Sequence, residues 1–227
     1  MKKYLLLLST ALAFILAPVA ANANVTAGIS ISSNSLDTAG KEDVDNNGTI
    51  DDTKNVSDDF TVGSVFLEKT VMGEKFGVTL GVDYIPFDAD IDKRSISQSS
   101  VKGKSDGAAS TGTNSVEGTV SDHTTFYIQP GMRVGTNSML YVSYGFVTAD
   151  IEGKSTSLSH TDITETKSLD GNKSAVGIKR VSDNGLVLKL EASETSYDTI
   201  SFTTSNNTKA TADLDNTALA LSIGKQF

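Results

Sequence analysis

The chain has 227 residues, with 19 Lys and Arg against 28 Asp and Glu, and it contains no cysteine. The absence of cysteine excludes disulfide frameworks, thiol catalysis and thiolate metal sites. The acidic balance argues against nucleic acid as a partner.

The first residues have the features of an export signal. The positively charged start MKK precedes a short apolar run and the small-x-small site Ala21-Asn22-Ala23. This pattern predicts a secretory signal peptide over 1–23, because the run is too short for a membrane anchor. Residues 24–227 are then one exported domain with a net charge of −11, from 17 basic and 28 acidic residues.

Apolar and polar residues alternate along most of the exported domain, and period two predicts β-strands with two different faces. Two strands are less regular than the others. Phe60 to Val71 fits either face, and we expect a bulge near Ser64. In the second, Val176 and Ile178 are expected on the apolar side. The eight predicted strands cover 25–32, 60–71, 76–84, 125–133, 140–146, 174–181, 186–193 and 218–227.

The connections alternate between short and long. Glycine and asparagine in the short ones are typical of hairpin turns. In an antiparallel up-and-down meander, all long loops then lie at one end and all tight turns at the other. The 95–122 part of the second loop is rich in Ser, Gly and Thr and is expected to be mobile. The predicted turns are 72–75, 135–138 and 182–185, and the predicted long loops are 34–57, 87–122, 152–171 and 198–213.

The polar faces of the strands indicate which side of the closed sheet is inside. They are rich in glycine, serine and threonine with a few charges of both signs, which suits a narrow lumen better than a solvated exterior. The apolar faces would then meet lipid, so the sequence predicts an all-β, eight-stranded transmembrane β-barrel. The predicted lumen charge network is Asp83, Arg133, Lys179, Lys189 and Glu191. Aromatic residues expected at the two membrane interfaces are Tyr84, Phe87, Phe126, Phe146, Tyr197 and Phe227.

The last predicted strand, ALALSIGKQF, ends the chain on Phe227 with apolar residues spaced by two. It resembles the closing strand of bacterial outer-membrane barrels, although Lys225 stands where that family prefers an apolar residue. Over residues 24–227 the chain resembles the small eight-stranded OmpA/OmpX-like barrels, without the peptidoglycan-binding domain of longer members. The resemblance implies the bacterial outer membrane with its lipid, the barrel-assembly machinery as a partner of Phe227, periplasmic termini and turns, and extracellular long loops.

The stretch DVDNNGTIDD in the first long loop follows the spacing of a calcium-binding loop. Side-chain or backbone oxygens from Asp43, Asp45, Asn47, Thr49 and Asp51 could bind a hard cation. Lys54 occupies the place of the usual bidentate glutamate, and no helical pattern flanks the stretch. An acidic solvated turn is the alternative. No cofactor is required, and calcium is the one candidate, with sub-millimolar to millimolar affinity.

Three functions remain open. The leading one is a non-enzymatic outer-membrane barrel whose loops do structural or surface-interaction work, with the extracellular partner unknown. The second is a small porin-like channel, although opposite charges in a narrow lumen would pair and block it. The third is an outer-leaflet lipid-modifying or peptide-cleaving enzyme, for which only His123 and His160 offer a general base.

Overall fold

A computed structural model describes residues 23–227 except 44–45, 103–108, 157–161 and 204–207. The predicted signal peptide therefore lies almost wholly outside the described residues and stays a prediction. The described residues contain no helix that could span a bilayer. Ten strands run along the chain: β1 (Ala23–Asp43), β2 (Asp52–Met72), β3 (Phe76–Tyr84), β4 (Ala89–Lys102), β5 (Ala109–Val134), β6 (Ser138–Thr156), β7 (Ile163–Val181), β8 (Leu186–Tyr197), β9 (Ile200–Thr203) and β10 (Lys209–Gln226).

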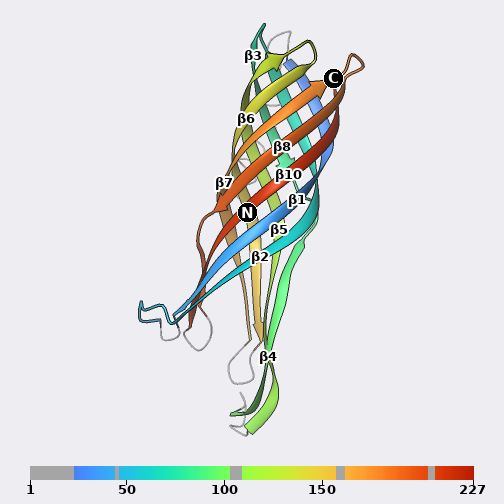
Figure 1. The fold of residues 1–227 in the computed structure, drawn as a ribbon. Helices are drawn as coiled ribbons and strands as arrows, with labels where there is room; N and C mark the ends of the chain where they lie inside the picture. The colour runs from blue at the N-terminus through green and yellow to red at the C-terminus, as the bar shows by residue number, and fades with distance from the viewer. Residues whose placement is uncertain (1–22, 44–45, 103–108, 157–161, 204–207) are drawn as a thin grey trace.

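Eight of these strands close into an antiparallel barrel (Figure 1). The ring order is β1-β2-β3-β5-β6-β7-β8-β10, and β10 pairs back onto β1 along its whole length. Strands β4 and β9 lie outside the ring, where each pairs with one neighbour, β5 or β10. The predicted fold class, an eight-stranded antiparallel up-and-down barrel, is confirmed.

Three tight turns close one end of the barrel, as predicted. Gly135 and Gly185 adopt φ values of 72° and 78°, which a side chain would disfavour. In the first turn the Gly73 amide donates to the Phe76 carbonyl at 2.8 Å. This end, which also holds the C-terminus in Figure 1, is called the turn end below.

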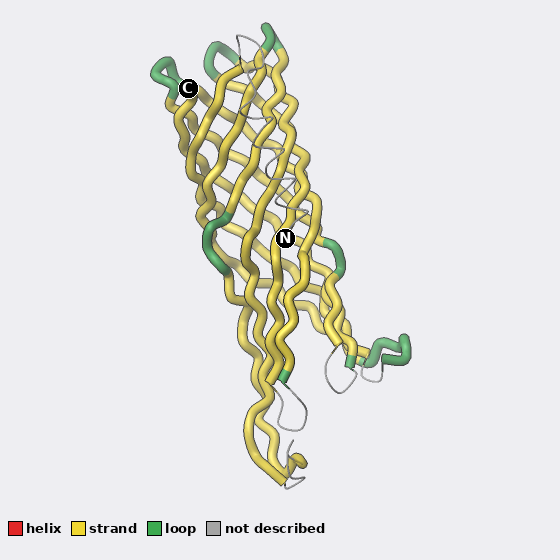
Figure 2. Tube along the Cα trace, turned by 180° about the vertical axis from the view of Figure 1, so that it is seen from behind, coloured by secondary structure: helices red, strands yellow, loops and turns green. Residues whose placement is uncertain are grey.

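At the opposite end the predicted long loops are wrong over most of their length. Strands β1, β5, β6, β7 and β10 continue far into them, and β4 and β9 form inside them. Alternation of exposed apolar residues stops there because the outer face is no longer in contact with lipid, while backbone pairing continues. Long hairpins therefore extend from the barrel (Figure 2).

Apolar side chains cover the outside of the half of the barrel next to the turns. Strand β6 is representative: Leu140, Val142, Tyr144 and Phe146 are exposed, and the alternate residues point inward. Val176 and Ile178 are exposed as predicted. This outer surface is called the apolar band, and it is formed by residues 25–31, 65–71, 76–84, 126–134, 140–146, 174–181, 186–192 and 219–227.

Strand β2 has no bulge at Ser64. Its register with β1 is continuous from Ala23 opposite Val71 to Glu42 opposite Asp52, so the expected bulge is wrong. Phe66 and Glu68 point inward and are buried, whereas Val65 is exposed. An aromatic ring inside the barrel made the alternation of this strand look reversed.

Beyond the apolar band the ring is interrupted in two places, because β3 ends at Tyr84 and β8 ends at Tyr197. The strands that continue form two groups, one of β9, β10, β1 and β2 and the other of β4, β5, β6 and β7, and their far ends diverge in Figures 1 and 2. Near the band the two groups share an apolar cluster with buried Ala149, Ile151, Leu169, Ile200 and Leu214. These extensions are called the outer sheets, and the cluster is called the outer core.

Candidate functional site: a charged network in the barrel lumen

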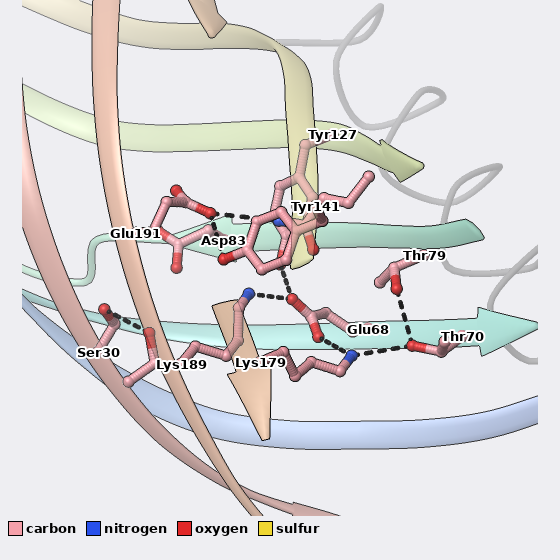
Figure 3. A network of polar contacts seen from close by, with 12 residues as sticks. Ser30, Glu68, Thr70, Thr79, Asp83, Tyr127, Tyr141, Lys179, Lys189 and Glu191 are labelled. Carbon is pink, nitrogen blue, oxygen red and sulfur yellow. Dashed lines mark hydrogen bonds and ion pairs between the residues drawn. The ribbon is translucent and has the colours of Figure 1, made fainter. Parts of the chain in front are cut away.

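Glu68 of β2 is the centre of an ionic network inside the apolar band (Figure 3). Its side chain has no solvent-exposed surface. Lys179 of β7 donates to Oε2 at 3.0 Å, Tyr127 of β5 donates to Oε1 at 2.9 Å, and Lys189 of β8 also donates to Oε1. Because β7 lies opposite β2 in the ring, the Glu68–Lys179 pair crosses the lumen.

Glu191 of β8 is the centre of a second group. Lys173 forms an ion pair with its Oε1 at 2.9 Å, and Tyr141 donates to its Oε2 at 3.0 Å. Gln129 of β5 donates to the same oxygen at 3.3 Å. These contacts connect three different strands to β8, so the second group also reaches across the interior.

Lys189 lies among three aromatic rings. Its Nζ is 5.0 Å from the Phe66 centroid, 5.5 Å from Tyr127 and 5.7 Å from Tyr141, within the range of cation–π attraction. On the turn side, Lys179 also donates to Thr70 Oγ1 at 2.9 Å, and Thr70 is 2.9 Å from Thr79. Every named ammonium group therefore has acceptors or ring faces around it.

Inward-facing glycines make the room that these rings occupy. A Cβ on Gly81 would lie 2.3 Å from Tyr127 Cζ, and one on Gly177 would lie 2.4 Å from the Tyr141 hydroxyl. A Cβ on Gly28 would lie 2.5 Å from Phe66 Cζ. The glycines predicted for a narrow lumen are therefore docking positions for aromatic rings from other strands.

The predicted charge network is brought together only in part. Lys179, Lys189 and Glu191 are members, and Asp83 accepts a hydrogen bond from Ser64 at 2.8 Å beside them. Arg133 is not in this cluster: it is exposed near the turn end, where β5 ends. Its inclusion was wrong because alternation fixes the side of a strand but not the depth along the barrel.

Two central members were missed. Glu68 lies in the strand whose face was ambiguous, and Lys173 lies one residue before the predicted start of its strand. Continuing the inward positions Lys179, Gly177 and Ala175 back by two residues would have found Lys173. With these two, the network of described residues contains three carboxyl groups and three ammonium groups.

Just beyond the apolar band, His123 lies at a shift in the register between β5 and β6. Its Nε2 is 3.0 Å from the hydroxyl of Tyr197, and the two rings meet edge to face. Burial, with a contribution from the nearby Lys173 charge, lowers the His123 pKa to about 4. Burial also raises the pKa of Tyr197 to about 12, so both groups are neutral at pH 7.

Tyr197 is therefore not the interface aromatic that the sequence predicted. It points inward, bonds to His123 and packs against the outer core. Phe87, Phe146 and Phe227 are strongly exposed, as expected for residues at an interface. His160, the other candidate base, lies outside the described residues.

The calcium-loop residues form a capped turn. The Asp43 carboxylate accepts the amides of Asn47 at 2.9 Å and Gly48 at 2.7 Å, and Asn47 Oδ1 accepts the Thr49 amide at 2.8 Å. Gly48 has a φ of 90°. Asp45 lies outside the described residues, and among the described residues, those of this loop included, no group of three or more acidic or histidine residues is arranged to hold a metal. Calcium binding by Asp43, Asp45, Asn47, Thr49 and Asp51 stays a prediction.

No protein-family model and no curated protein matches the sequence. Among solved structures, the fold is similar to the outer membrane protein OprG from Pseudomonas aeruginosa, with 14% identity, a TM-score of 0.50, and coverage of 91% of this chain and 96% of OprG. It is also similar to the outer membrane protease OmpT from Escherichia coli (9% identity, TM-score 0.48, 94% and 100% covered). A third is Ail, the attachment invasion locus protein of Yersinia pestis (13% identity, TM-score 0.40, 89% and 98% covered).

At these identities the similarity shows the fold alone. The closed ring of eight strands, the polar lumen and the exposed apolar band define a transmembrane β-barrel. The chain has the fold and the lipid-facing surface of a small bacterial outer-membrane β-barrel, consistent with the predicted OmpA/OmpX-like architecture.

Proposed function

We propose that this protein is a sealed, non-enzymatic outer-membrane barrel that holds its two outer sheets outside the cell for structural or surface-interaction work. One observation carries the proposal: Glu68 and its lysines join opposite walls across the lumen. The outer core then fills the space between the sheets just beyond the band. A lumen filled first by this polar network and then by an apolar cluster favours a closed barrel that supports the outer sheets over an open channel.

We take the orientation from the resemblance to the OmpA/OmpX-like barrels, in which the tight turns and the termini are periplasmic and the long loops are extracellular. The turn end then faces the periplasm. The C-terminal Phe227 is then periplasmic and highly exposed, where the barrel-assembly machinery could recognise it. Outer-membrane lipid is the partner of the apolar band.

The absence of enzymatic activity is part of the proposal. Of the described residues, only Tyr197 hydrogen-bonds to the His123 imidazole, and its buried Nδ1 has no partner. A general base needs a nucleophile in reach and an orienting group, and neither a serine nor a carboxylate bonds to this ring. Hydrolysis or acylation of lipid by purified protein, lost on His123→Ala, would contradict this part.

Planar-bilayer recording tests whether the lumen is sealed. Wild-type barrel, folded as judged by different gel migration of boiled and unboiled samples, should show no unitary current steps. Glu68→Ala should introduce steps or noise because it removes the charge that joins β2, β7 and β8. The matched control is Glu74→Gln, which changes an exposed acid in the first turn. A steady unitary conductance in wild type would favour the channel alternative.

Exposure of the outer sheets is tested on intact cells. A protease site inserted after Asn47, in the β1–β2 connection, should be cut by added protease, and one inserted after Asn137, in a tight turn, should be protected. Cutting of the Asn137 site alone would reverse the proposed orientation.

A further inference from the structure

The outer half of β2 has an open edge. Residues Val65–Val71 pair with β1 on one side and β3 on the other. From Asp52 to Ser64 the strand pairs with β1 only, because β3 begins its pairing at Tyr84 opposite Val65. A strand edge of this kind presents a row of backbone N–H and C=O groups that another strand can bind.

This edge is longer than the open edge of β7, where Ile163–Asp170 pair with β6 only, and more regular than the open edge of β4. The β4–β5 pairing shifts register between Ile91 and Arg94 and again between Gln98 and Val101, and such irregularities discourage further pairing. Strand β9 has only four residues. In contrast, β2 keeps one continuous register with β1 over its whole length, so it offers a straight template.

We propose that this β2 edge binds the β2 edge of a second copy of the chain as an antiparallel pair. A twofold axis perpendicular to the sheet relates the two copies. Side chains that share a face of β2 therefore lie on the same side of the combined sheet in both copies. Lys54, Val56 and Asp58 share one face, because alternate residues of a strand point the same way. If the axis passes through Val56, Lys54 of each copy stands opposite Asp58 of the other.

Other registers fit less well. An axis through Asn55 sets Asp52 opposite Asp58, and an axis through Asp58 sets that carboxylate opposite its own copy. An axis through Ser57 sets Val56 opposite Asp58. Opposite charges directly across an antiparallel pair attract and like charges repel, so the Val56 register is the one that the sequence favours.

The surface is accessible in the described structure. Lys54, Asp58 and Asp59 are exposed, and Val56 is half-buried. Charged residues on an edge often prevent pairing with unrelated strands. Here Lys54 and Asp58 attract a strand that carries the opposite charges at the facing positions and repel one that does not. A second copy of β2 in the Val56 register meets this condition, which gives specificity for an identical strand.

An antiparallel pair has a consequence for the location of the two copies. Strand β2 runs from the outer sheets toward the apolar band, so the β2 of the second copy runs the other way and its band lies on the far side. The two barrels therefore sit in facing membranes. Val56 is nine residues from Val65, or roughly 30 Å along the strand at ~3.3 Å per residue, so the contact lies well outside each bilayer. The inference rests on the proposed function, because it uses the outer sheets as an extracellular surface.

Charge exchange between two populations of proteoliposomes tests the pairing. Dynamic light scattering should show large particles for wild-type vesicles because they cluster. Vesicles with Lys54→Asp and vesicles with Asp58→Lys should each lose most of this increase in particle size. A mixture of the two variants should cluster again, because each Asp then faces a Lys. The double variant K54D/D58K should cluster by itself. Asp59→Lys is the matched control, since Asp59 lies on the other face of the same strand, and it should leave clustering in place.

Two results would overturn the inference: dispersed wild-type vesicles with the outer sheets accessible to protease, or mixed variants that do not cluster. Gel migration of boiled and unboiled samples verifies that each variant is folded. Bilayer recording of the same proteins separates the two proposals, because conductance reports only the lumen. A conducting barrel that clusters would overturn the sealed platform and leave the edge pairing intact.

Discussion

The apolar band and the outer sheets are built by the same strands with opposite chemistry. In β6 the odd-numbered residues point inward along the whole strand. Within the band these are Tyr141, Ser143 and Gly145, and beyond it they are Val147, Ala149 and Ile151. The outward positions change in the reverse sense, from Val142 and Phe146 to Asp150 and Glu152.

This inversion follows from the solvent. In hydrocarbon the outside must be apolar, and polar groups gather where they can bond to one another. In water the outside must be polar and the inside is stabilised by apolar burial, as in a soluble sandwich. The change occurs near Phe146, so the strand itself marks where lipid ends. The two regions should therefore respond differently to the same kind of mutation.

The largest effect is expected inside the band. Glu68→Ala leaves Lys179 and Lys189 buried without their shared carboxylate, and removing one partner of a buried pair costs about 3–5 kcal/mol of unfolding free energy. Urea unfolding in detergent, followed by gel migration, measures it. The combination of Glu68→Met with Lys179→Met should recover part of the loss. If Glu68→Ala were no worse than Glu74→Gln, the network would not stabilise the barrel.

In the outer core, Ile151→Ala should cost about 2–4 kcal/mol, but locally. The side chain is 4% exposed and packs between the two outer sheets, so its loss should speed amide hydrogen exchange in the outer halves of β6 and β7. The band should keep its heat-dependent gel shift. Leu221→Ala is the contrasting control, because this lipid-facing side chain is 57% exposed and its loss leaves no cavity in the protein. Equal loss of protection in both regions would mean that they unfold as one unit.

The third prediction tests the packing of rings on glycines. Gly81→Ala places a methyl group into the Tyr127 ring and should destabilise the barrel by about 1–3 kcal/mol. Gly63→Ala is the control: its added Cβ would meet only Ser30 O, at 3.8 Å. The same unfolding assay should show no loss, or a small gain, for this variant. Similar losses at both positions would point to a general effect of glycine replacement rather than to the ring.

The sequence predicted the band well and the outer sheets poorly, for one reason. Within the band, contact with lipid requires an apolar residue at every second position. A strand such as Leu186–Ser193 can therefore be predicted from its own residues alone. Beyond it, β1 continues as Asn34–Asp43 with mostly small and polar residues on both faces. Its pairing there comes from neighbours β2 and β10, which no single stretch of sequence shows.

The lumen network was predictable by residue type and not by contact. Alternation placed Lys179, Lys189 and Glu191 on the inner side, and the structure confirms them there. It could not place Glu68 because Phe66 on the same face reads as lipid-facing, although Gly28 makes room for its ring inside the barrel. Depth along a tilted strand, which excludes Arg133 from the network, depends on the register of all eight strands together.

The smallest expected effect concerns His123, at the junction of the two regions. Its folded pKa of about 4 lies below the usual 6.5, so the neutral ring stabilises the fold fully above about pH 6.5. That contribution is lost as pH falls from about 6.5 through about 4, because protonation then favours the unfolded chain. Since the residue is partly exposed, the expected loss of unfolding free energy is about 1–2 kcal/mol. His123→Gln, which can still bond to Tyr197, should flatten this part of the profile. Urea midpoints of both proteins between pH 4 and pH 7.5 should therefore diverge, and parallel curves would show that the ring titrates as in water.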